Sequence, residues 1–271
     1  MPASSVITRL RVGLGSLVAV EAEAGSARQA ERAISAAFDA IATVERTMHP
    51  VRAGSDLAAL AASRPGVPLR LHAWTWEVLR LCRELWQASD GVFDPCLGDA
   101  PGRMDDLEFP EPERVLTRAS VRIDLGGIAK GYAVDRALES LRTAGCTAGL
   151  VNAGGDLAVF GDEPRAIARR DSRGDAWALQ LMNAAVATSD AGAADRPPEH
   201  RGYYHGVERC VVRTGSTTVT APLAVLADAL TKCTLLCEPA RSEQLLARYG
   251  AREVRFARPG ADRSPMWPTS N

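Results

Sequence analysis

The sequence predicts an α+β fold in which mixed β-sheets are flanked by helices. Strand-like segments occur in both halves of the chain, at residues 5–12 and 16–22 and again at residues 208–213 and 217–221. Amphipathic segments with helical spacing lie between and after them, and residues 223–237 are the clearest example. The chain has 46% hydrophobic and 24% charged residues, a composition typical of a globular protein.

The 271 residues fit one large folded unit, which we place at residues 1–257. Residues 258–271 are rich in proline and are expected to form a loosely ordered tail. A net charge of -1 provides no basic field for nucleic acid. No apolar run approaches the roughly 20 residues of a membrane span. We see no secretory or lipoprotein signal either, so the expected location is the cytoplasm.

Two helices are expected in the first third of the chain. The first begins after Ser26, which can cap it, and Gln29 completes a capping box. Its apolar residues recur at helical spacing, namely Ile34, Phe38, Ile41, Val44 and Met48. The second helix, at residues 75–88, presents one face made of Trp76, Leu79, Cys82 and Trp86. Residues 99–112 are rich in proline, glycine and acid, which predicts an exposed loop.

The middle of the chain predicts a strand, a glycine turn, a helix and a second strand. The strands are expected at residues 121–125 and 149–152, and the helix at about residues 128–144, ended by Gly145. Further strands are expected at residues 177–182 and 185–188, and a last helix at residues 242–249. Because the six cysteines are scattered and form no CxxC pair, we expect reduced thiols rather than a zinc site or a disulfide framework.

The strongest candidate site is the turn from Asp124 to Gly131. Gly126 and Gly127 lie where a strand meets a helix N-terminus, and exposed N–H groups there favour an anion. Lys130 opposes the helix dipole, so its position needs a reason such as a bound phosphate. The alternative is a plain turn with a surface lysine.

Four further segments are weaker signals. Paired glycines in the run from Asn152 to Asp156 permit close approach of a ligand, although the pattern alone favours a tight turn between two strands. The run from Gly91 to Pro95 is either a site or a helix-terminating turn, and the run from Ala187 to Asp190 is either a site or an ordinary turn. Asp228 and Lys232 share a helix face, and spacing alone favours an exposed ion pair.

Taken together and in order, these motifs resemble the ApbE family of FAD:protein FMN transferases. The run from Asp124 to Asp135 matches the family pattern without a gap. The other matches are Met48 with residues 55–57, and residues 91–95, 151–156, 187–189 and 227–230. The resemblance covers roughly residues 5–257. It implies an ApbE-like fold with an FAD cleft between lobes, where the Asp124 turn meets the helix that carries Asp228.

The resemblance also implies an activity and its residues. Family members bind FAD and Mg2+, transfer FMN to a Ser or Thr hydroxyl of an acceptor protein and release AMP. Contacts to FAD would come from Met48, Val92, Phe93, Asp94, Asp124, Lys130, Asn152, Gly154, Gly155 and Thr188. Metal ligands would be the Gly127 carbonyl and Asp228, with Thr231 as the nearest hydroxyl. Asp228, Lys232 and His205 would be the catalytic residues.

The chain departs from the family pattern in ways that keep other functions open. The family commonly has Thr or Ser four residues after the metal-binding Asp, where this chain has Lys232, whose ammonium could occupy the cation's place. Thr231 lies about 100° around the helix from that position. The family's H-x-x-D-P segment is reduced to His205 and Glu208. A catalytically quiet FAD-binding protein and an FAD pyrophosphate hydrolase therefore remain as alternatives.

Overall fold

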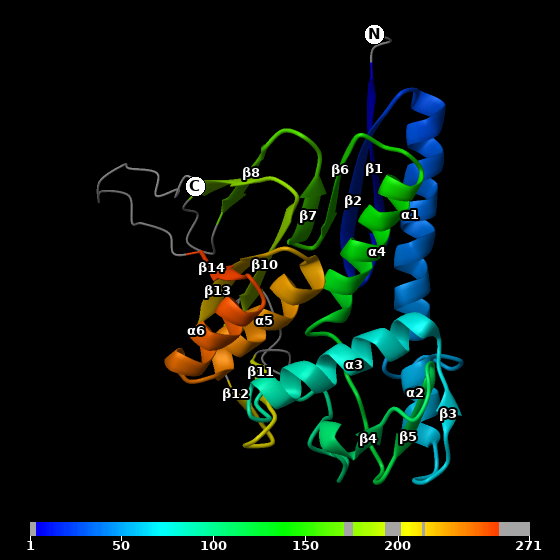
Figure 1. Cartoon of the computed structure of the whole chain (residues 1–271), viewed down its shortest axis with the longest axis vertical. Coiled ribbons are helices and arrows are strands. Elements are labelled where there is room, and N and C mark those ends of the chain that lie inside the picture. Colours follow the sequence, from blue (N-terminus) through cyan, green and yellow to red (C-terminus); the bar gives the residue numbers. More distant parts are fainter. Residues whose placement is uncertain (1–3, 171–175, 193–201, 213–214, 255–271) are drawn as a thin grey trace.

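The computed structural model describes residues 4–170, 176–192, 202–212 and 215–254 (Figure 1). Within these residues the main sheet has the strand order β1-β2-β6-β7-β10-β13-β14, and every neighbouring pair is antiparallel. Its strands are β1 (Ser5–Gly13), β2 (Ser16–Ala24), β6 (Ala148–Ala153), β7 (Asp156–Phe160), β10 (Ala184–Asp190), β13 (Ser216–Ala221) and β14 (Arg252–Glu253). The predicted α+β class and the flanking helices are confirmed.

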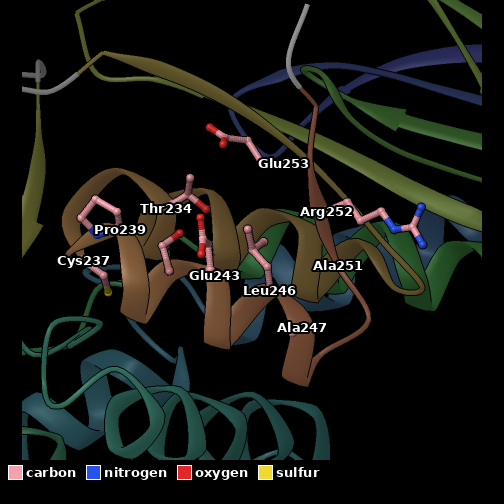
Figure 2. A pocket seen from close by; sticks show the side chains of 10 residues that line it. Thr234, Cys237, Pro239, Glu243, Leu246, Ala247, Ala251, Arg252 and Glu253 are labelled. Atoms are coloured by element: carbon pink, nitrogen blue, oxygen red, sulfur yellow. The ribbon is translucent and has the colours of Figure 1, made fainter. Parts of the chain in front are cut away.

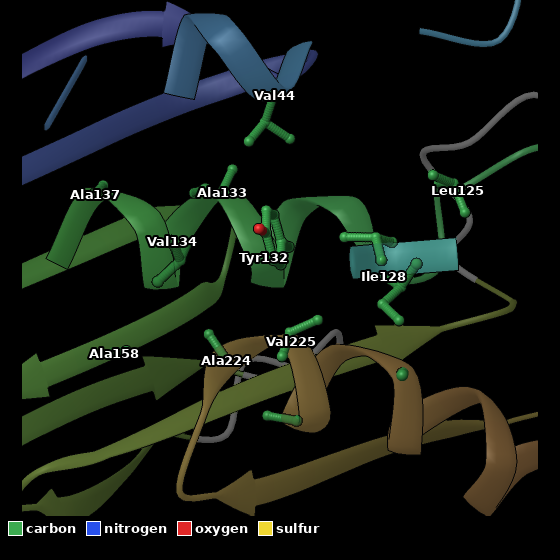
Figure 3. Close-up of a cluster of buried hydrophobic side chains, with 14 of the residues drawn as sticks. Val44, Leu125, Ile128, Tyr132, Ala133, Val134, Ala137, Ala158, Ala224 and Val225 are labelled. Carbon is green, nitrogen blue, oxygen red and sulfur yellow. The ribbon is translucent and has the colours of Figure 1, made fainter. Parts of the chain in front are cut away.

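Three helices cover the main sheet. They are α1 (Ala27–Thr47), α4 (Ala129–Thr143) and α5 (Ala224–Leu236). Helix α4 lies between the other two, in contact with both. Figure 3 shows this packing: Val44 of α1 faces one side of α4, and Ala224 and Val225 of α5 face the other side. Many of the buried contacts are made by alanine, which lets the helices approach closely.

A second group of elements packs at one end of α1. It contains α2 (Asp56–Ala62), α3 (Ala73–Ala88), the short 3-10 helix η1 (Met104–Asp106) and a small sheet of β3 (Leu69–Arg70), β5 (Arg114–Thr117) and β4 (Leu107–Glu108). Figure 1 shows these elements as a lobe below the main sheet. Two hairpins complete the described fold, β8 (Arg165–Arg170) with β9 (Ala176–Leu181) and β11 (Tyr203–His205) with β12 (Cys210–Val212). Helix α6 (Pro239–Arg248) follows α5 and contacts it.

The long helices and the first hairpin are confirmed, but the capping box at α1 is only half right. The Ser26 hydroxyl accepts from the backbone N–H of Gln29 at 3.3 Å, as predicted. The Gln29 side chain instead donates to the carbonyls of Ala144 and Gly145 at 2.9 and 3.2 Å. It therefore joins the start of α1 to the end of α4, a long-range contact that local pattern cannot indicate.

Two local predictions in the middle of the chain are wrong. Residues 121–125 form no strand; one isolated bridge joins Ile123 to Cys96. Residues 99–112 are not simply an exposed loop, because η1 and β4 bury Met104 and Leu107 completely. Both segments also contact residues 94–97: the backbone N–H of Asp124 donates to the Pro95 carbonyl at 3.0 Å, and that of Met104 donates to the Asp94 carboxylate at 3.5 Å.

The remaining sequence-level predictions have mixed outcomes. All six cysteines are free thiols. Gly145 ends α4 with a φ of 76°, the left-handed conformation expected of a C′ residue. In the part of the chain that the structure describes, no helix has the length and apolarity needed to cross a membrane. The proposed tail at residues 258–271 lies outside the described residues.

Candidate functional site

The N-terminus of α4 and the middle of α5 meet at the carboxylate of Asp228. This side chain has 0% exposure. One carboxylate oxygen accepts from the backbone N–H of Gly131 at 3.1 Å, and the other pairs with the ammonium of Lys232. The Lys232 ammonium also donates to the Asp228 carbonyl at 3.0 Å. The pair is therefore buried, and the exposed ion pair favoured by spacing alone is wrong.

A second ion pair lies at the start of α4. The ammonium of Lys130 pairs with Asp156, which follows the glycine turn between β6 and β7. The Asp156 side chain is 2% exposed, whereas that of Lys130 is 33% exposed. The first turn of α4 is thus tied to both α5 and the main sheet, and Lys130 still faces solvent.

The four charged groups influence one another. Burial alone raises the pKa of Asp228, but the ammoniums of Lys232 and Lys130 bring it below its ordinary value. Burial raises the pKa of Asp156 to about 6, and the Asp228 charge adds to this, while Lys130 and Lys232 oppose it. Burial lowers the pKa of Lys130, yet the two carboxylates raise it above its ordinary value. The cluster combines two carboxylates with two ammoniums, so it is balanced in charge.

A cavity of about 260 Å³, here called the Asp124 cavity, lies beside this cluster. Its walls come from residues 93–97, from the 124–128 turn, from β11 and from α5, including Phe93, Asp94, Asp124, Gly127, Tyr203 and Lys232. The predicted meeting of the Asp124 turn with the α5 helix is confirmed. The volume lies slightly below the ~300–1,000 Å³ of typical ligand sites. The Asp124 cavity can therefore hold part of a dinucleotide rather than all of it.

The glycine turn is shaped by its contact with Lys232 rather than by unusual backbone angles. The Asp124 carboxylate accepts from the N–H of Gly126 at 2.8 Å, and neither Gly126 nor Gly127 has a positive φ. A Cβ placed on Gly127 would lie 3.4 Å from Cε of Lys232. The turn and the lysine stem therefore lie close together, with room between them for little more than a methyl group.

A second cavity, of about 340 Å³, lies on the main sheet at the turn between β6 and β7. It is lined by three of the predicted FAD contacts, Asn152, Gly154 and Gly155, together with residues of β8 and β10. Gly154 and Gly155 have φ values of 61° and 103°. These backbone conformations are strained for any residue that has a side chain. The Asn152 side chain accepts from the N–H of Gly155 at 3.0 Å and so fixes the turn.

Residues 91–94 are held next to the Asp124 cavity by hydrogen bonds. The Asp94 carboxylate accepts from the N–H groups of Cys96 at 2.8 Å and Met104 at 3.5 Å. Burial nevertheless raises the pKa of Asp94 above its ordinary value. The Val92 carbonyl accepts from Gly206 at 3.0 Å, which joins this segment to the turn after β11. Phe93 and Asp94 reach the Asp124 cavity, whereas Val92 does not line it.

Met48, Thr188 and His205 are predicted site residues that line neither the Asp124 cavity nor the cavity at the β6–β7 turn. Met48 is the buried C-cap of α1 and belongs to the main hydrophobic core. Thr188 pairs its hydroxyl with that of Thr218 at 2.8 Å on neighbouring strands. His205 ends β11, and its Nδ1 accepts from the N–H of Glu208 at 3.2 Å. No described cavity contains any of the three, and their roles toward FAD or catalysis stay predictions.

Sequence reasoning missed three residues that position the site. Gly131 allows α4 and α5 to touch, because a Cβ there would lie 2.8 Å from Cβ of Asp228 and would overlap the Ala224 carbonyl. Asp135 accepts from the N–H groups of Ala224 and Val225, both at 2.8 Å, and so caps α5. Ser189 shares a hydrogen bond of 2.6 Å with Thr231. Gly131 and Asp135 both lie inside the motif that carries the resemblance, a signal that could have been used.

The residues present do not fit a magnesium site. Magnesium requires near-octahedral oxygen ligands, but the Asp228 carboxylate is already bonded to an ammonium and a backbone N–H. The Thr231 hydroxyl contacts Ser189 and donates to the Asp228 carbonyl at 2.6 Å. Among the described residues no group of three or more His, Cys, Asp or Glu side chains could hold a metal ion. The ligand role of Gly127, Asp228 and Thr231 therefore stays a prediction without structural support.

A larger cavity than the Asp124 cavity lies elsewhere, between α6 and β14 (Figure 2). It has about 620 Å³ and is lined by residues such as Cys237, Glu243, Leu246 and Arg252. None of the predicted site residues contributes to it. We therefore choose the functional site by the charged cluster of Lys130, Asp156, Asp228 and Lys232, and not by the volume of the cavity.

Comparison with known proteins shows the family of this chain. The model of the ApbE family matches residues 14–102 and 99–256. An FAD:protein FMN transferase of Rhodobacter capsulatus is 27% identical over 58% of this chain, an alignment that covers only 36% of that protein. One of Treponema pallidum is 24% identical over 86% of this chain and 79% of its own length.

Solved structures show the same fold. The apo form of the flavinyl transferase ApbE of Pseudomonas stutzeri has a TM-score of 0.79. It is 20% identical, and the match covers 94% of this chain and 92% of that protein. Because the family model matches nearly all of the described residues, including the charged cluster and the Asp124 turn, the chain belongs to the ApbE family.

Proposed function

We propose that this protein transfers the FMN part of FAD to a Ser or Thr hydroxyl of an acceptor protein and releases AMP. Membership of the ApbE family supports this, as do the relatives named FAD:protein FMN transferase. The observation that carries the proposal is the placement of Lys130 and Lys232. Both ammoniums lie by the N-terminus of α4, and Lys232 lines the Asp124 cavity. A dinucleotide diphosphate needs positive charge of this kind.

The transfer is a substitution at phosphorus. The acceptor hydroxyl oxygen bonds to the phosphorus on the FMN side, the bond from that phosphorus to the bridging oxygen breaks, and AMP leaves with the bridging oxygen. The hydroxyl proton passes to a base or to solvent. Lys130 is partly exposed and can stabilise the charge that develops on the phosphate oxygens.

Asp228 is poorly suited to accept that proton. Its carboxylate has 0% exposure, and both oxygens accept hydrogen bonds. Burial raises its pKa, but Lys232 and Lys130 lower it by a larger amount, so that the pKa lies below its ordinary value. We therefore assign Asp228 as the residue that positions Lys232. Asp124 is exposed and lines the Asp124 cavity, which makes it the better-placed proton acceptor.

A catalytically quiet FAD-binding protein is the second candidate function. The pairing of Lys232 with Asp228 favours it, because relatives with a hydroxyl at this position would leave the carboxylate available to a metal. Hydrolysis of FAD to FMN and AMP would use the same site with water as the nucleophile. The cytoplasmic location also stays a prediction.

One experiment separates these functions. The purified protein is incubated with FAD, with and without Mg2+, alone and with an acceptor protein that carries a known Ser/Thr flavinylation site. Transfer predicts AMP and covalent flavin on the acceptor in equal amounts, measured by chromatography and by flavin fluorescence in a denaturing gel. AMP without protein-bound flavin would indicate hydrolysis. Bound but intact FAD in every arm would overturn transfer in favour of the quiet binder.

A further inference from the structure

The ammonium of Lys232 lies where a cation beside Asp228 would lie. It bonds to the carboxylate and to the backbone carbonyl of the same residue. Its stem packs against Gly127, and the ammonium lies 5.7 Å from the centre of the Tyr203 ring, which adds a favourable cation–π contact. Lys232 is only 7% exposed, yet it lines the Asp124 cavity. It can therefore reach a ligand there without leaving Asp228.

The charge balance of the cluster argues against an additional divalent cation. Asp156 and Asp228 supply two negative charges, and Lys130 and Lys232 supply two positive charges. Before the FAD diphosphate binds, a magnesium ion would leave an excess of two positive charges in a site where Asp228 has 0% exposure. Buried charge without compensation is strongly unfavourable.

The oxygen atoms that a metal would need are also engaged. Asp228 bonds to Lys232 and Gly131, and the Thr231 hydroxyl bonds to Ser189 and to the Asp228 carbonyl. A metal would have to displace an ammonium from one group and break a buried hydrogen bond at the other. No group of three or more His, Cys, Asp or Glu side chains among the described residues offers an alternative site for the ion.

We propose that Lys232 is a built-in cation that replaces the divalent metal, so that the protein binds the FAD diphosphate with Lys232 and Lys130 and needs no Mg2+. The inference rests on the proposed function only in taking FAD as the ligand. The protein would then work equally well in the presence of a chelator. The positive charge of Lys232 on α5 would then take the place of the metal ion.

The test measures metal binding and FAD binding separately. Mn2+ serves as a paramagnetic probe, and its binding is followed by electron paramagnetic resonance. FAD affinity is followed by flavin fluorescence in EDTA and in Mg2+. The wild type is expected to bind no Mn2+ at submillimolar concentration and to show the same FAD dissociation constant, within twofold, in both buffers.

Three variants sharpen the result. Lys232→Thr is expected to gain Mn2+ binding and an FAD affinity at least tenfold higher in Mg2+ than in EDTA. Lys232→Met removes the charge without adding a ligand and is expected to lose FAD affinity in both buffers. Lys232→Arg keeps the charge and should remain indifferent to the chelator. If Lys232→Thr does not fold, the wild type and Lys232→Arg still decide the question.

Stoichiometric Mn2+ binding by the wild type, or loss of its FAD affinity in EDTA, would overturn the inference. These results are independent of catalysis. Metal-independent FAD binding without any transfer to an acceptor would contradict the proposed function while leaving the role of Lys232 supported.

Discussion

Gly131 of α4 lies directly against Asp228 of α5, with its backbone N–H donated to the carboxylate at 3.1 Å. A methyl group on Gly131 would overlap the Ala224 carbonyl and come within 2.8 Å of Cβ of Asp228. We expect Gly131→Ala to lower the free energy of unfolding by about 1–3 kcal/mol, as overpacking of a core does. Urea unfolding followed by circular dichroism measures this.

Gly25→Ala is the matched control for this substitution. Gly25 has no positive φ, and a Cβ there would meet only the flexible end of Gln29 at 3.6 Å. The control should remain close to the wild type. Equal stability of the two variants would contradict the close α4–α5 contact.

The ion pair of Lys130 and Asp156 is expected to contribute more to the free energy of unfolding than a surface ion pair does. Lys130→Met leaves the buried Asp156 carboxylate without its ammonium, and we expect a loss of up to about 3 kcal/mol, reduced from the cost of a fully buried pair because Lys130 is partly exposed. In the double variant Lys130→Met/Asp156→Leu, much of this loss should be regained. A double-mutant cycle of urea unfolding measures the coupling. Strictly additive losses would show that the two residues act separately.

The raised pKa of Asp135 predicts that the free energy of unfolding depends on pH. Burial raises its pKa to about 6, although the N–H groups of Val225 and Ala224 oppose this. Between the ordinary pKa of about 3.9 and pH 6, the folded protein holds a proton that the unfolded chain has released. The contribution of Asp135 to stability is therefore full below about pH 4, falls as the pH rises to 6 and is constant above it.

The variant Asp135→Asn isolates this contribution. The stability of the wild type relative to Asp135→Asn should decrease from pH 4 to pH 6 and then level off. At pH 7 the variant should also lose about 0.5–2 kcal/mol, because one acceptor of the helix cap is removed. Glu139→Gln, on an exposed part of the same helix, serves as the control. A pH-independent difference for Asp135→Asn would refute the raised pKa.

Phe93 is the aromatic side chain on the wall formed by residues 93–97. If it stacks on part of FAD, Phe93→Ala should weaken FAD binding by about 0.5–1.5 kcal/mol, or roughly 2–12-fold. The ring of Phe109 packs on Trp76 and does not line the Asp124 cavity, so Phe109→Ala should leave the FAD affinity unchanged. Fluorescence titration of FAD compares the two variants. Equal affinities would place the flavin away from this wall.

The sequence predicts the elements whose signals are local. Helix α1 has an uninterrupted apolar face and a capping serine, and α4 ends at a glycine, so both can be recognised from neighbouring residues. The 121–125 segment has the composition of a strand but makes a single bridge, at Ile123, because its surroundings offer no further partner strand. Composition indicates burial there, but pairing depends on distant residues.

The burial of Lys232 shows a different limit. Two charged residues four apart on a helix usually lie on its exposed face, and the spacing of Asp228 and Lys232 predicts such a pair. In α5, however, nearly every residue from Ala224 to Cys233 is buried. Apart from this pair and two threonines, the helix is made of apolar residues on every side, which is itself a signal of a buried helix. The pairing of Asp228 with Lys232 can thus be predicted from their spacing, but its burial cannot.

Helix α4 sets three of the contacts that define the site: Lys130 reaches the sheet, Gly131 receives α5, and Asp135 fixes the first turn of α5. Two of these residues hold α5, which carries Lys232, so α4 links the position of its own Lys130 to that of Lys232. A substitution at the contact between α4 and α5 would therefore change where Lys232 lies relative to Lys130 while leaving both charged residues in place.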